Sequence, residues 1–245
     1  MVIIGSARHD ERGKYSGGKA GDQTQKIENG YDMTGEVSTQ AFYNHSKGWV
    51  ILRAKDKNLA SGLAFCMAIA CVNKNIGYSQ SDRGGVIKYG ILTEKPCNAD
   101  CSTLVRACIK QCGYDVPNFT TANEVKILTE SGLFEKVEFS SVSGLYDGDI
   151  LVTKTKGHTA IVVSGAMSRS VTEKNPYKEP TNTVRKGSKG ESVKWIQWAL
   201  NKHGANLTID GDFGNKTYLA VKAFQNAHGL TVDGIVGGQT RVALK

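Results

Sequence analysis

The stretch Asp100-Cys101-Ser102-Thr103-Leu104-Val105 places a cysteine at the start of an apolar helical run. Further along, Gly157-His158-Thr159-Ala160-Ile161-Val162 places a histidine at the head of an apolar strand. The free N–H groups and the dipole of a helix N-terminus stabilise a thiolate, and a histidine on a neighbouring strand can accept and return its proton. The pair therefore predicts a nucleophile, Cys101, and a base, His158. Taken alone, each residue also has a structural explanation, as a small buried side chain or as the first residue of a strand.

The chain has 245 residues, enough for two small domains or one large one. No segment approaches the ~18 apolar residues of a membrane span, so no membrane insertion is expected. The apolar run Val2-Ile3-Ile4 is too short for the core of a secretory signal. We expect a chain without a signal peptide, which stays in the cytoplasm as made or leaves by a route that does not read its N-terminus.

Residues 168–183 contain two prolines and few apolar residues, which is typical of a linker. The sequence thus predicts a domain over 1–167 and a second over 184–245. The net charge of +8 is concentrated in the second domain, which holds nine Lys/Arg against four Asp/Glu. A basic domain favours a polyanionic partner. Nucleic acid is not expected as that partner, because basic and aromatic residues do not interleave.

The first domain mixes predicted helices and strands, which indicates an α+β fold. β-Branched and apolar residues predict strands over 35–43, 48–53, 134–139, 149–152 and 159–163. An apolar run predicts a buried helix over 58–73. The sequence Thr121-Ala122-Asn123-Glu124 is typical of a capping box and predicts a helix that ends at Gly132.

All six cysteines fall within 47 residues of a long chain, unlike those of a secreted disulfide scaffold. A zinc site is one alternative function for four of them: Cys97, Cys101, Cys108 and Cys112. Their spacing lacks the CxxC knuckle, and no histidine is near. Another alternative is a metal held by His9 and His45 with Asp10 or Asp22, as in a zinc amidase, but no helical His-x-x-x-His pair supports it. The sequence therefore predicts no metal and no cofactor.

An internal repeat occupies the second domain. The segment 207–217 recurs as 230–240, with an offset of 23 residues throughout. Each copy has a hydrophobic residue, an Asp-Gly turn, a second hydrophobic residue beside glycine, and a segment that leads into a helix. Amphipathic patterns before and between the copies predict a small three-helix domain.

This second domain resembles the peptidoglycan-binding domain found on many cell-wall hydrolases. The matching segments are 185–193, Ile196-Gln197, Asp210-Gly211-Asp212-Phe213-Gly214, 220–225 and Asp233-Gly234-Ile235-Val236-Gly237. The resemblance implies a module that docks on the glycan and peptide of a Gram-positive-type wall.

The first domain resembles cysteine peptidases of the NlpC/P60 type, which are compact relatives of papain. The resemblance is carried by 100–105, by Tyr146-Asp147-Gly148-Asp149-Ile150-Leu151 and by 157–163. It implies a papain-like α+β fold with Cys101 as nucleophile and His158 as base. It further implies that Asp100 and Ser102 help hold a substrate amine, and that Tyr78 matches the family's tyrosine upstream of the nucleophile.

The family places a third polar residue, often histidine, on the strand after the base. Here the next polar residue is Ser164, and no histidine follows until His203. Alternatively, the polar, Gly-rich segment 6–24 supplies the group. That segment resembles the N-terminal lead of phage lysins, so Asp22 or Gln23 is expected to orient the base or donate to the oxyanion. A solvated N-terminal arm is the competing interpretation.

Together these features predict a phage endolysin that cleaves an amide bond in the peptidoglycan stem peptide and reaches the wall after release from the host cytoplasm. The same Cys/His chemistry would serve an N-acetylmuramoyl-L-alanine amidase or a transpeptidase-like acyltransferase. A non-catalytic wall-binding protein is the remaining alternative.

Overall fold

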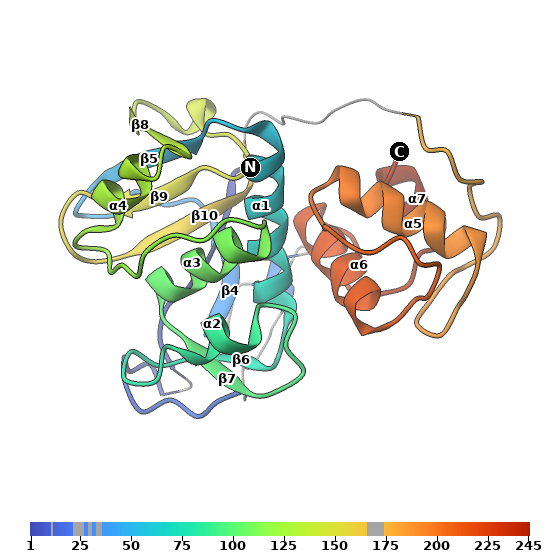
Figure 1. Cartoon of the computed structure of the whole chain (residues 1–245), viewed down its shortest axis with the longest axis horizontal. Helices are drawn as coiled ribbons and strands as arrows, with labels where there is room; N and C mark the ends of the chain where they lie inside the picture. The colour runs from blue at the N-terminus through green and yellow to red at the C-terminus, as the bar shows by residue number, and fades with distance from the viewer. Residues whose placement is uncertain (11, 22–26, 29–30, 33–35, 166–173) are drawn as a thin grey trace.

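The computed structural model describes residues 1–10, 12–21, 27–28, 31–32, 36–165 and 174–245. We call residues 1–165 the front lobe and residues 174–245 the tail. Figure 1 shows the front lobe as a sheet with helices packed on it, and the tail as a group of helices on the other side of α1. Helix α1 (Lys57–Val72) therefore lies between the sheet and the tail.

The main sheet of the front lobe has six strands in the order β4-β1-β10-β9-β5-β8, and every neighbouring pair is antiparallel. Five of its strands lie where the sequence predicts them: β4 (Val37–Ala41), β5 (Trp49–Ala54), β8 (Phe134–Glu138), β9 (Ile150–Thr153) and β10 (Thr159–Ser164). The mixed α+β character of the front lobe is confirmed.

The sixth strand, β1 (Ile3–Ala7), was not predicted. All five of its residues are buried, and it pairs with β10 on one side and β4 on the other. The apolar start of the chain is therefore a central strand of the sheet. This pairing brings the N-terminal residues beside the strand that His158 precedes.

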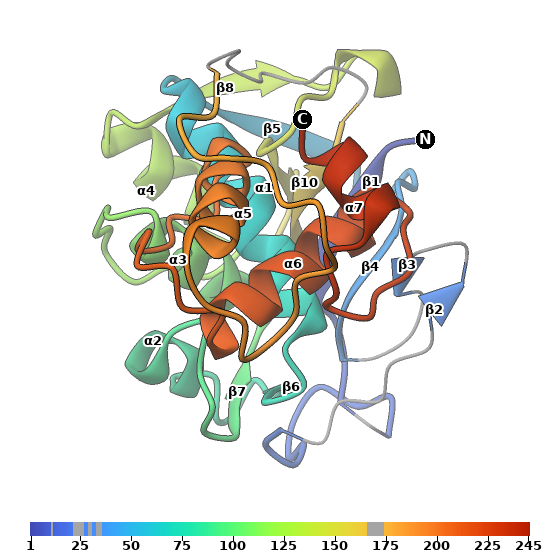
Figure 2. The ribbon, with the colours of Figure 1, turned by 90° about the vertical axis from the view of Figure 1, so that its right-hand side faces the viewer.

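Short elements complete the front lobe (Figures 1 and 2). Strands β6 (Ile76–Tyr78) and β7 (Cys97–Ala99) form a parallel pair, and β2 (Ile27–Glu28) pairs with β3 (Tyr31–Asp32). The helices beside them are α2 (Gly85–Tyr89) and α3 (Cys101–Gln111), and a single 3₁₀ turn, η1 (Val142–Gly144), precedes β9.

Helix α4 (Glu124–Glu130) lies in the predicted region but begins differently. The predicted capping box at Thr121 does not form, because Asn123 is the N-cap residue and its side chain accepts a hydrogen bond from the Thr120 N–H instead. Glu124 is completely buried rather than capping the helix.

The tail contains the three predicted helices: α5 (Glu191–Lys202), α6 (Asn215–Ala227) and α7 (Gly238–Ala243). The internal repeat appears as two matching hydrogen-bond networks. In the first, the buried Gln197 amide donates to Asp210 Oδ1 at 2.8 Å and accepts from the Gly211 N–H at 2.9 Å. Gln225 makes the same contacts with Asp233 Oδ1 and the Gly234 N–H, both at 2.8 Å. The repeated residues are therefore turn-forming and structural.

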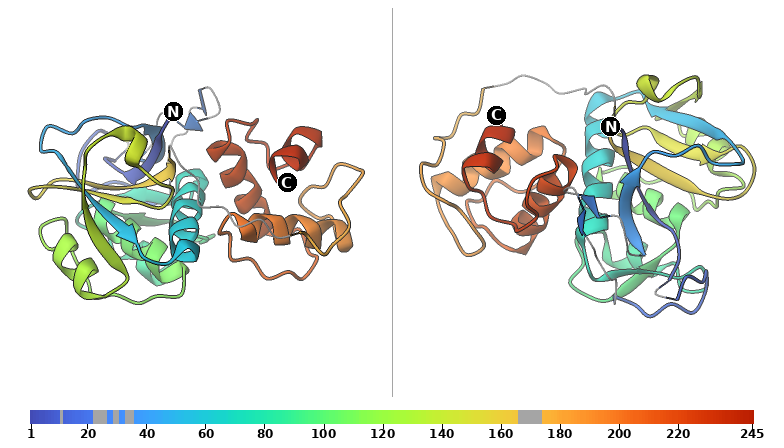
Figure 3. Two further views of the ribbon diagram at one scale, coloured as in Figure 1. Left: turned by 90° about the horizontal axis from the view of Figure 1, so that it is seen from above. Right: turned by 180° about the vertical axis from the view of Figure 1, so that it is seen from behind.

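The tail packs directly on the front lobe through α6 and α1, as Figures 2 and 3 show. Thirteen of the sixteen residues of α1 are buried, so this helix is covered on both its sheet side and its tail side. Buried apolar residues of the two lobes form one continuous cluster. At the contact, Gly204 lies so close to the Ser61 carbonyl that a Cβ would overlap it, and Asn226 donates to Thr39 Oγ1 at 3.3 Å.

Candidate functional site

Cys101 is the first residue of α3 and is 7% exposed. The helix begins there because Asp100 caps it: Asp100 Oδ1 accepts the Thr103 N–H at 2.7 Å, and the Asp100 N–H donates to Thr103 Oγ1 at 2.8 Å. This reciprocal box satisfies backbone donors that the first turn leaves unpaired. It also places the thiol at the N-terminal end of the helix, as predicted.

His158 directly precedes β10, and its ring is held by the N-terminal strand. Its Nε2 lies 3.2 Å from Ser6 Oγ, and its ring centroid lies 6.4 Å from that of Trp49. Burial lowers the pKa of His158 to about 4, and the nearby positive charge of Arg8 acts in the same direction. The imidazole is therefore neutral at physiological pH and available as a base.

Helix α3 packs against β10, which brings Cys101 to the residue that follows His158. The backbone N–H groups of Thr159 and Ser102 reach the Cys101 sulfur and favour a thiolate. Burial has the larger effect, and together with the negative charge of Asp100 it raises the pKa of Cys101 to about 12. The Cys101 thiol and the His158 imidazole are thus both neutral at rest, whereas the helix N-terminus alone predicted a stabilised thiolate.

Two tyrosines lie in the electrostatic neighbourhood of the thiol. Tyr78, on β6, is 2% exposed, and burial followed by the charges of Cys101 and Asp100 raises the pKa of its phenol. Burial also raises the pKa of Tyr43, with a further contribution from Cys101. The structure therefore brings the predicted Tyr78 to the site and adds Tyr43, which the sequence did not indicate.

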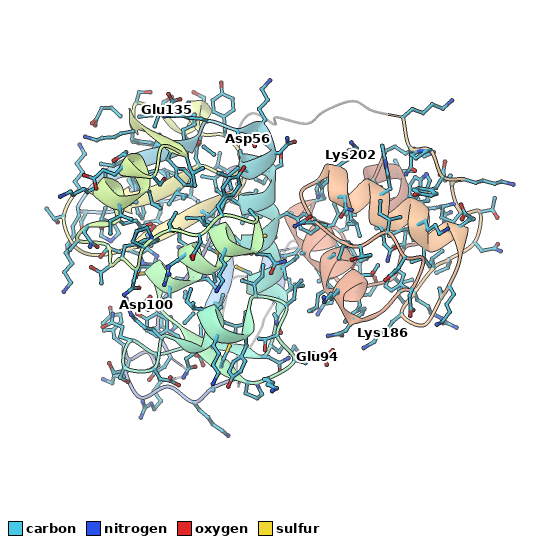
Figure 4. The ribbon with its side chains drawn as sticks, in the orientation of Figure 1. Asp56, Glu94, Asp100, Glu135, Lys186 and Lys202 are labelled. Atoms are coloured by element: carbon cyan, nitrogen blue, oxygen red, sulfur yellow. The ribbon has the colours of Figure 1, made fainter. Side chains whose placement is uncertain are left out.

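Asp100 and Ser102, predicted to hold a substrate amine, are engaged by a residue that sequence reasoning missed. Arg83 Nη1 donates to Asp100 Oδ2 at 2.7 Å and to Ser102 Oγ at 3.2 Å. The Ser102 hydroxyl also donates to Asp100 Oδ1 at 3.0 Å. A substrate amine would have to compete with the Arg83 guanidinium for this carboxylate. Figure 4 shows Asp100 on the side of α1 away from the tail, which carries Lys186.

Of the three predicted candidates for the third catalytic residue, only Ser164 lies in the described part of the chain. Ser164 is at the opposite end of β10 from His158, six residues or about 20 Å along the strand, so the structure does not bring the two together. Asp22 and Gln23 lie outside the described residues. The position beside His158 Nε2 is occupied by Ser6, a member of the predicted segment 6–24.

Further polar contacts are made by residues on β4 and by residues that directly flank β1 and β4. Arg8 donates to Gln40 and Ser38, and the buried carboxylate of Glu36 accepts the Tyr78 N–H. Apart from Tyr78, none of them was singled out as a site residue: Arg8 belongs to the polar segment 6–24, and the others lie in the strand predicted over 35–43. For Arg8, the only signal in the sequence is the short apolar run that forms β1.

The described part of residues 6–24 is attached to the front lobe, although residues 12–17 are exposed to solvent. Asn98 Nδ2 donates to the Gly18 carbonyl at 3.1 Å, and a Cβ at Gly18 would overlap the Tyr78 carbonyl. This glycine therefore permits a close approach of the N-terminal loop to β6.

The Gly-Asp pair that precedes β9 has a structural role. Gly148 has a φ of +81° and leaves no room for a Cβ against the Ala60 carbonyl. Asp149 forms a buried ion pair with Arg53 and also accepts the Tyr146 N–H at 2.9 Å. The motif thus attaches the β9 turn to α1 and β5.

Among the described residues, no group of three or more His, Cys, Asp or Glu side chains is arranged to hold a metal ion. His9 Nδ1 contacts the Asp10 carbonyl at 3.0 Å, and His45 Nδ1 accepts the Lys47 N–H at 3.1 Å. All six cysteines are free thiols.

Within the described part of the chain, no helix is both long and apolar enough to cross a membrane.

The chain belongs to a family described as the endolysin-like domain, which matches residues 4–169. A second family, described as a putative peptidoglycan binding domain, matches residues 189–244. The chain thus joins an endolysin-like front lobe to a peptidoglycan-binding tail.

Curated relatives share one or both parts. The chain is 27% identical over 237 residues to the N-acetylmuramoyl-L-alanine amidase CwlL of Bacillus licheniformis, covering 92% of this chain and 62% of that protein. A zinc D-Ala-D-Ala carboxypeptidase of Streptomyces albus G is 44% identical over 63 residues, covering 24% of this chain and 25% of its own length. The spore cortex-lytic enzyme of Bacillus cereus is 34% identical over 86 residues, covering 35% of this chain and 33% of that enzyme.

The chain spans less than two thirds of the length of each of these relatives. Among solved structures, the N-terminal domain of SleB is 36% identical, covers 26% of this chain and 90% of its own, and has a TM-score of 0.26.

Proposed function

We propose that the chain is a peptidoglycan hydrolase that cleaves an amide bond, with Cys101 as nucleophile and His158 as base. The observation that carries the proposal is the packing of α3 against β10, because Cys101 is the first residue of α3 and His158 directly precedes β10. The peptidoglycan-binding tail and the hydrolases among the relatives support the substrate class. A papain-like arrangement of the NlpC/P60 type belongs to this proposal.

The mechanism begins from the neutral pair. Ser6 holds His158 Nε2, which leaves Nδ1 as the proton acceptor. As the sulfur attacks the amide carbon, the thiol proton passes to Nδ1 and the carbonyl oxygen becomes an oxyanion. Collapse of this intermediate breaks the C–N bond, and the imidazolium returns its proton to the leaving amine. Water then hydrolyses the thioester and regenerates the thiol.

The bond that we favour is an amide of the stem peptide in a Gram-positive-type wall. The second candidate is the amide between the lactyl group and L-alanine, because the relative that covers 92% of this chain is named an N-acetylmuramoyl-L-alanine amidase. Mass spectrometry of fragments released from defined walls separates them. New amino termini within stem peptides identify an endopeptidase, and free lactyl groups on the sugar identify an amidase.

The nucleophile is tested by Cys101→Ala. This variant should lose wall lysis while its full-length chain still sediments with walls. Cys97→Ala is the matched control, since Cys97 is another buried thiol of the same lobe and should be dispensable for catalysis. Lysis by Cys101→Ala at the rate of the parent chain would remove the nucleophile assignment and favour another mechanism.

Thiol alkylation near neutral pH does not distinguish this enzyme from a non-catalytic wall-binding protein. Burial raises the pKa of Cys101 to about 12 and that of Cys97 to about 11, so both thiols are protonated at rest. Slow labelling is expected in either case. Turnover of wall fragments is therefore the decisive measurement.

We further propose that the protein is a phage endolysin, made in the host cytoplasm and acting on the wall after release. The endolysin-like family match supports this part of the proposal. Lysis from outside by the purified chain, with no lysis from inside until the membrane is permeabilised, is the expected result.

A further inference from the structure

Two thiols that the mechanism above does not use meet where helix α3 ends against helix α1. Cys66 lies within α1, Cys112 is the C-cap residue of α3, and their sulfur atoms are 3.8 Å apart. The two helices lie side by side in the front lobe (Figure 1). A disulfide has an S–S bond of about 2.05 Å, so closing it here requires the two sulfurs to approach by about 1.8 Å from their separation of 3.8 Å.

The contact between the two sulfurs depends on a glycine in α1. Gly62 precedes Cys66 by four residues, so the two residues lie on one face of the helix, about one turn apart. A Cβ at Gly62 would lie only 2.8 Å from the Cys112 sulfur. Glycine weakens the interior of a helix, but at this position it lets the Cys112 sulfur approach the α1 backbone beside Cys66.

A small reagent can reach Cys112 but not Cys66. Cys112 is half-buried and lines an open cavity of about 240 Å³ between the front lobe and the tail, together with Gly62 and Gly204. A water molecule takes up about 30 Å³ of the liquid, so a molecule as small as hydrogen peroxide fits in this cavity. Cys66 is 1% exposed and does not line the cavity. An oxidant that enters from solvent therefore meets Cys112 first.

The other thiols of this helix pair are shielded. Cys108, one turn before Cys112 on α3, and Cys71, on α1, are both 0% exposed. Burial holds the pKa of the Cys108 thiol well above its ordinary value. The hydrogen bond with Cys112, followed by burial, does the same to the pKa of Cys66. Cys66 thus keeps its proton until its neighbour has reacted.

We propose that Cys66 and Cys112 form a peroxide-reactive dithiol, in which Cys112 meets the oxidant and Cys66 resolves the product into a disulfide. The ligand class is a small, diffusible peroxide. The new bond would join α1, which both lobes share, to the end of the helix that begins at Cys101. It would therefore fix the interface of these two helices. The inference does not depend on the proposed function.

The reaction balances over two steps. The Cys112 thiolate attacks one peroxide oxygen and the O–O bond breaks, which gives a sulfenic acid and a hydroxide that takes up the thiol proton as water. The Cys66 sulfur then attacks the Cys112 sulfur, and the S–O bond breaks. The departing hydroxide takes the Cys66 proton and leaves as a second water. The two thiols lose two electrons and two protons, and one peroxide is reduced to two waters.

The test counts free thiols in the full-length chain after one equivalent of hydrogen peroxide at pH 8. The parent chain should lose two of its six free thiols, and dithiothreitol should restore them. Peptide mass spectrometry should find the Cys66 and Cys112 peptides joined, with the loss of two hydrogens. Because the bond joins residues 46 positions apart, the oxidised chain should melt about 4–16 °C above the reduced one.

Four variants assign the roles. Cys112→Ser should form no disulfide, whereas Cys66→Ala should stop at a Cys112 sulfenic acid that dimedone traps. Cys108→Ala is the matched control, because it removes a buried thiol one turn from Cys112 and should still form the bond. Cys101→Ala should also form it, which separates this chemistry from the candidate nucleophile. Thermal unfolding of the reduced variants shows which are folded, and Cys112→Ser, at a half-buried position, decides if Cys66→Ala is not.

Three results would overturn the inference. They are six free thiols after peroxide treatment, a cross-link between any other pair of cysteines, and disulfide formation in Cys112→Ser. An oxidised chain that melts at the temperature of the reduced one would overturn the proposed effect on the interface of α1 and α3.

Discussion

Arg53 and Asp149 form the best-defined buried ion pair of the front lobe. The guanidinium donates to both carboxylate oxygens, at 2.9 Å and 2.7 Å, and to the Gly144 carbonyl at 2.8 Å. It also lies 4.3 Å from the centroid of the Tyr146 ring. The Asp149 side chain is 1% exposed, so Arg53 is its main source of charge compensation.

Arg53→Met should destabilise the protein strongly, because the Asp149 carboxylate would remain buried without a counter-charge. Removing one partner of a buried pair typically costs about 3–5 kcal/mol. In a chain of this length, about 2–4 °C of melting temperature is lost per kcal/mol, so we expect a decrease of about 6–20 °C. Thermal unfolding at pH 7, followed by circular dichroism, measures this change.

The matched control is Lys136→Met, on the adjacent strand β8. Lys136 pairs with Glu138 at 3.0 Å, but both side chains are largely exposed, so this change should cost less than about 1 kcal/mol. The double variant Arg53→Met/Asp149→Leu should recover part of the lost stability, since it removes the unpaired charge. If Arg53→Met melts within about 2 °C of the parent chain, the reasoning about the buried charge is refuted.

Two further predictions concern catalysis and wall binding. Ser6→Ala removes the hydrogen bond to His158, which is worth about 1 kcal/mol, and should lower kcat on soluble wall fragments about fivefold. The control Ser141→Ala changes an exposed serine and should leave kcat unchanged. Equal kcat values for Ser6→Ala and the parent chain would contradict the orienting role of Ser6. The +5 charge of residues 184–245 should help the full-length Cys101→Ala chain sediment with walls. A larger fraction should sediment at 0.1 M salt than at 1 M, because the Debye length falls from about 10 Å to about 3 Å. Sedimentation that does not change with salt would exclude a contribution of this charge to wall binding.

Local patterns in the sequence predicted most of the fold but not the strand that completes the site. The five predicted strands and the tail repeat have periodic or repeated apolar residues, so each could be recognised from a short segment of sequence. Strand β1 has only five residues, and its partner β10 begins about 150 residues later. Nothing within the first residues indicates that pairing, so Ser6 was named only as a member of a polar segment.

The protonation states at the site likewise depend on residues that are distant in the sequence as well as on local sequence. The helix N-terminus predicted a thiolate at Cys101, but burial by segments distant in the sequence raises its pKa. Glu124 matched a capping pattern, yet the carboxyl turned inward to Thr159. Position in the sequence identified Cys101 and His158 as candidates, whereas their protonation states depend on tertiary packing.

The burial of α1 on both sides has a consequence for how such an enzyme would move over its substrate. Because α1 is shared by the sheet and by α6, the tail and the thiol keep one separation and one orientation. An enzyme anchored through this tail would cut only bonds at that radius around its anchor. Progress across a wall would then require release and rebinding, so tighter anchoring would slow overall lysis even though each cut remained fast.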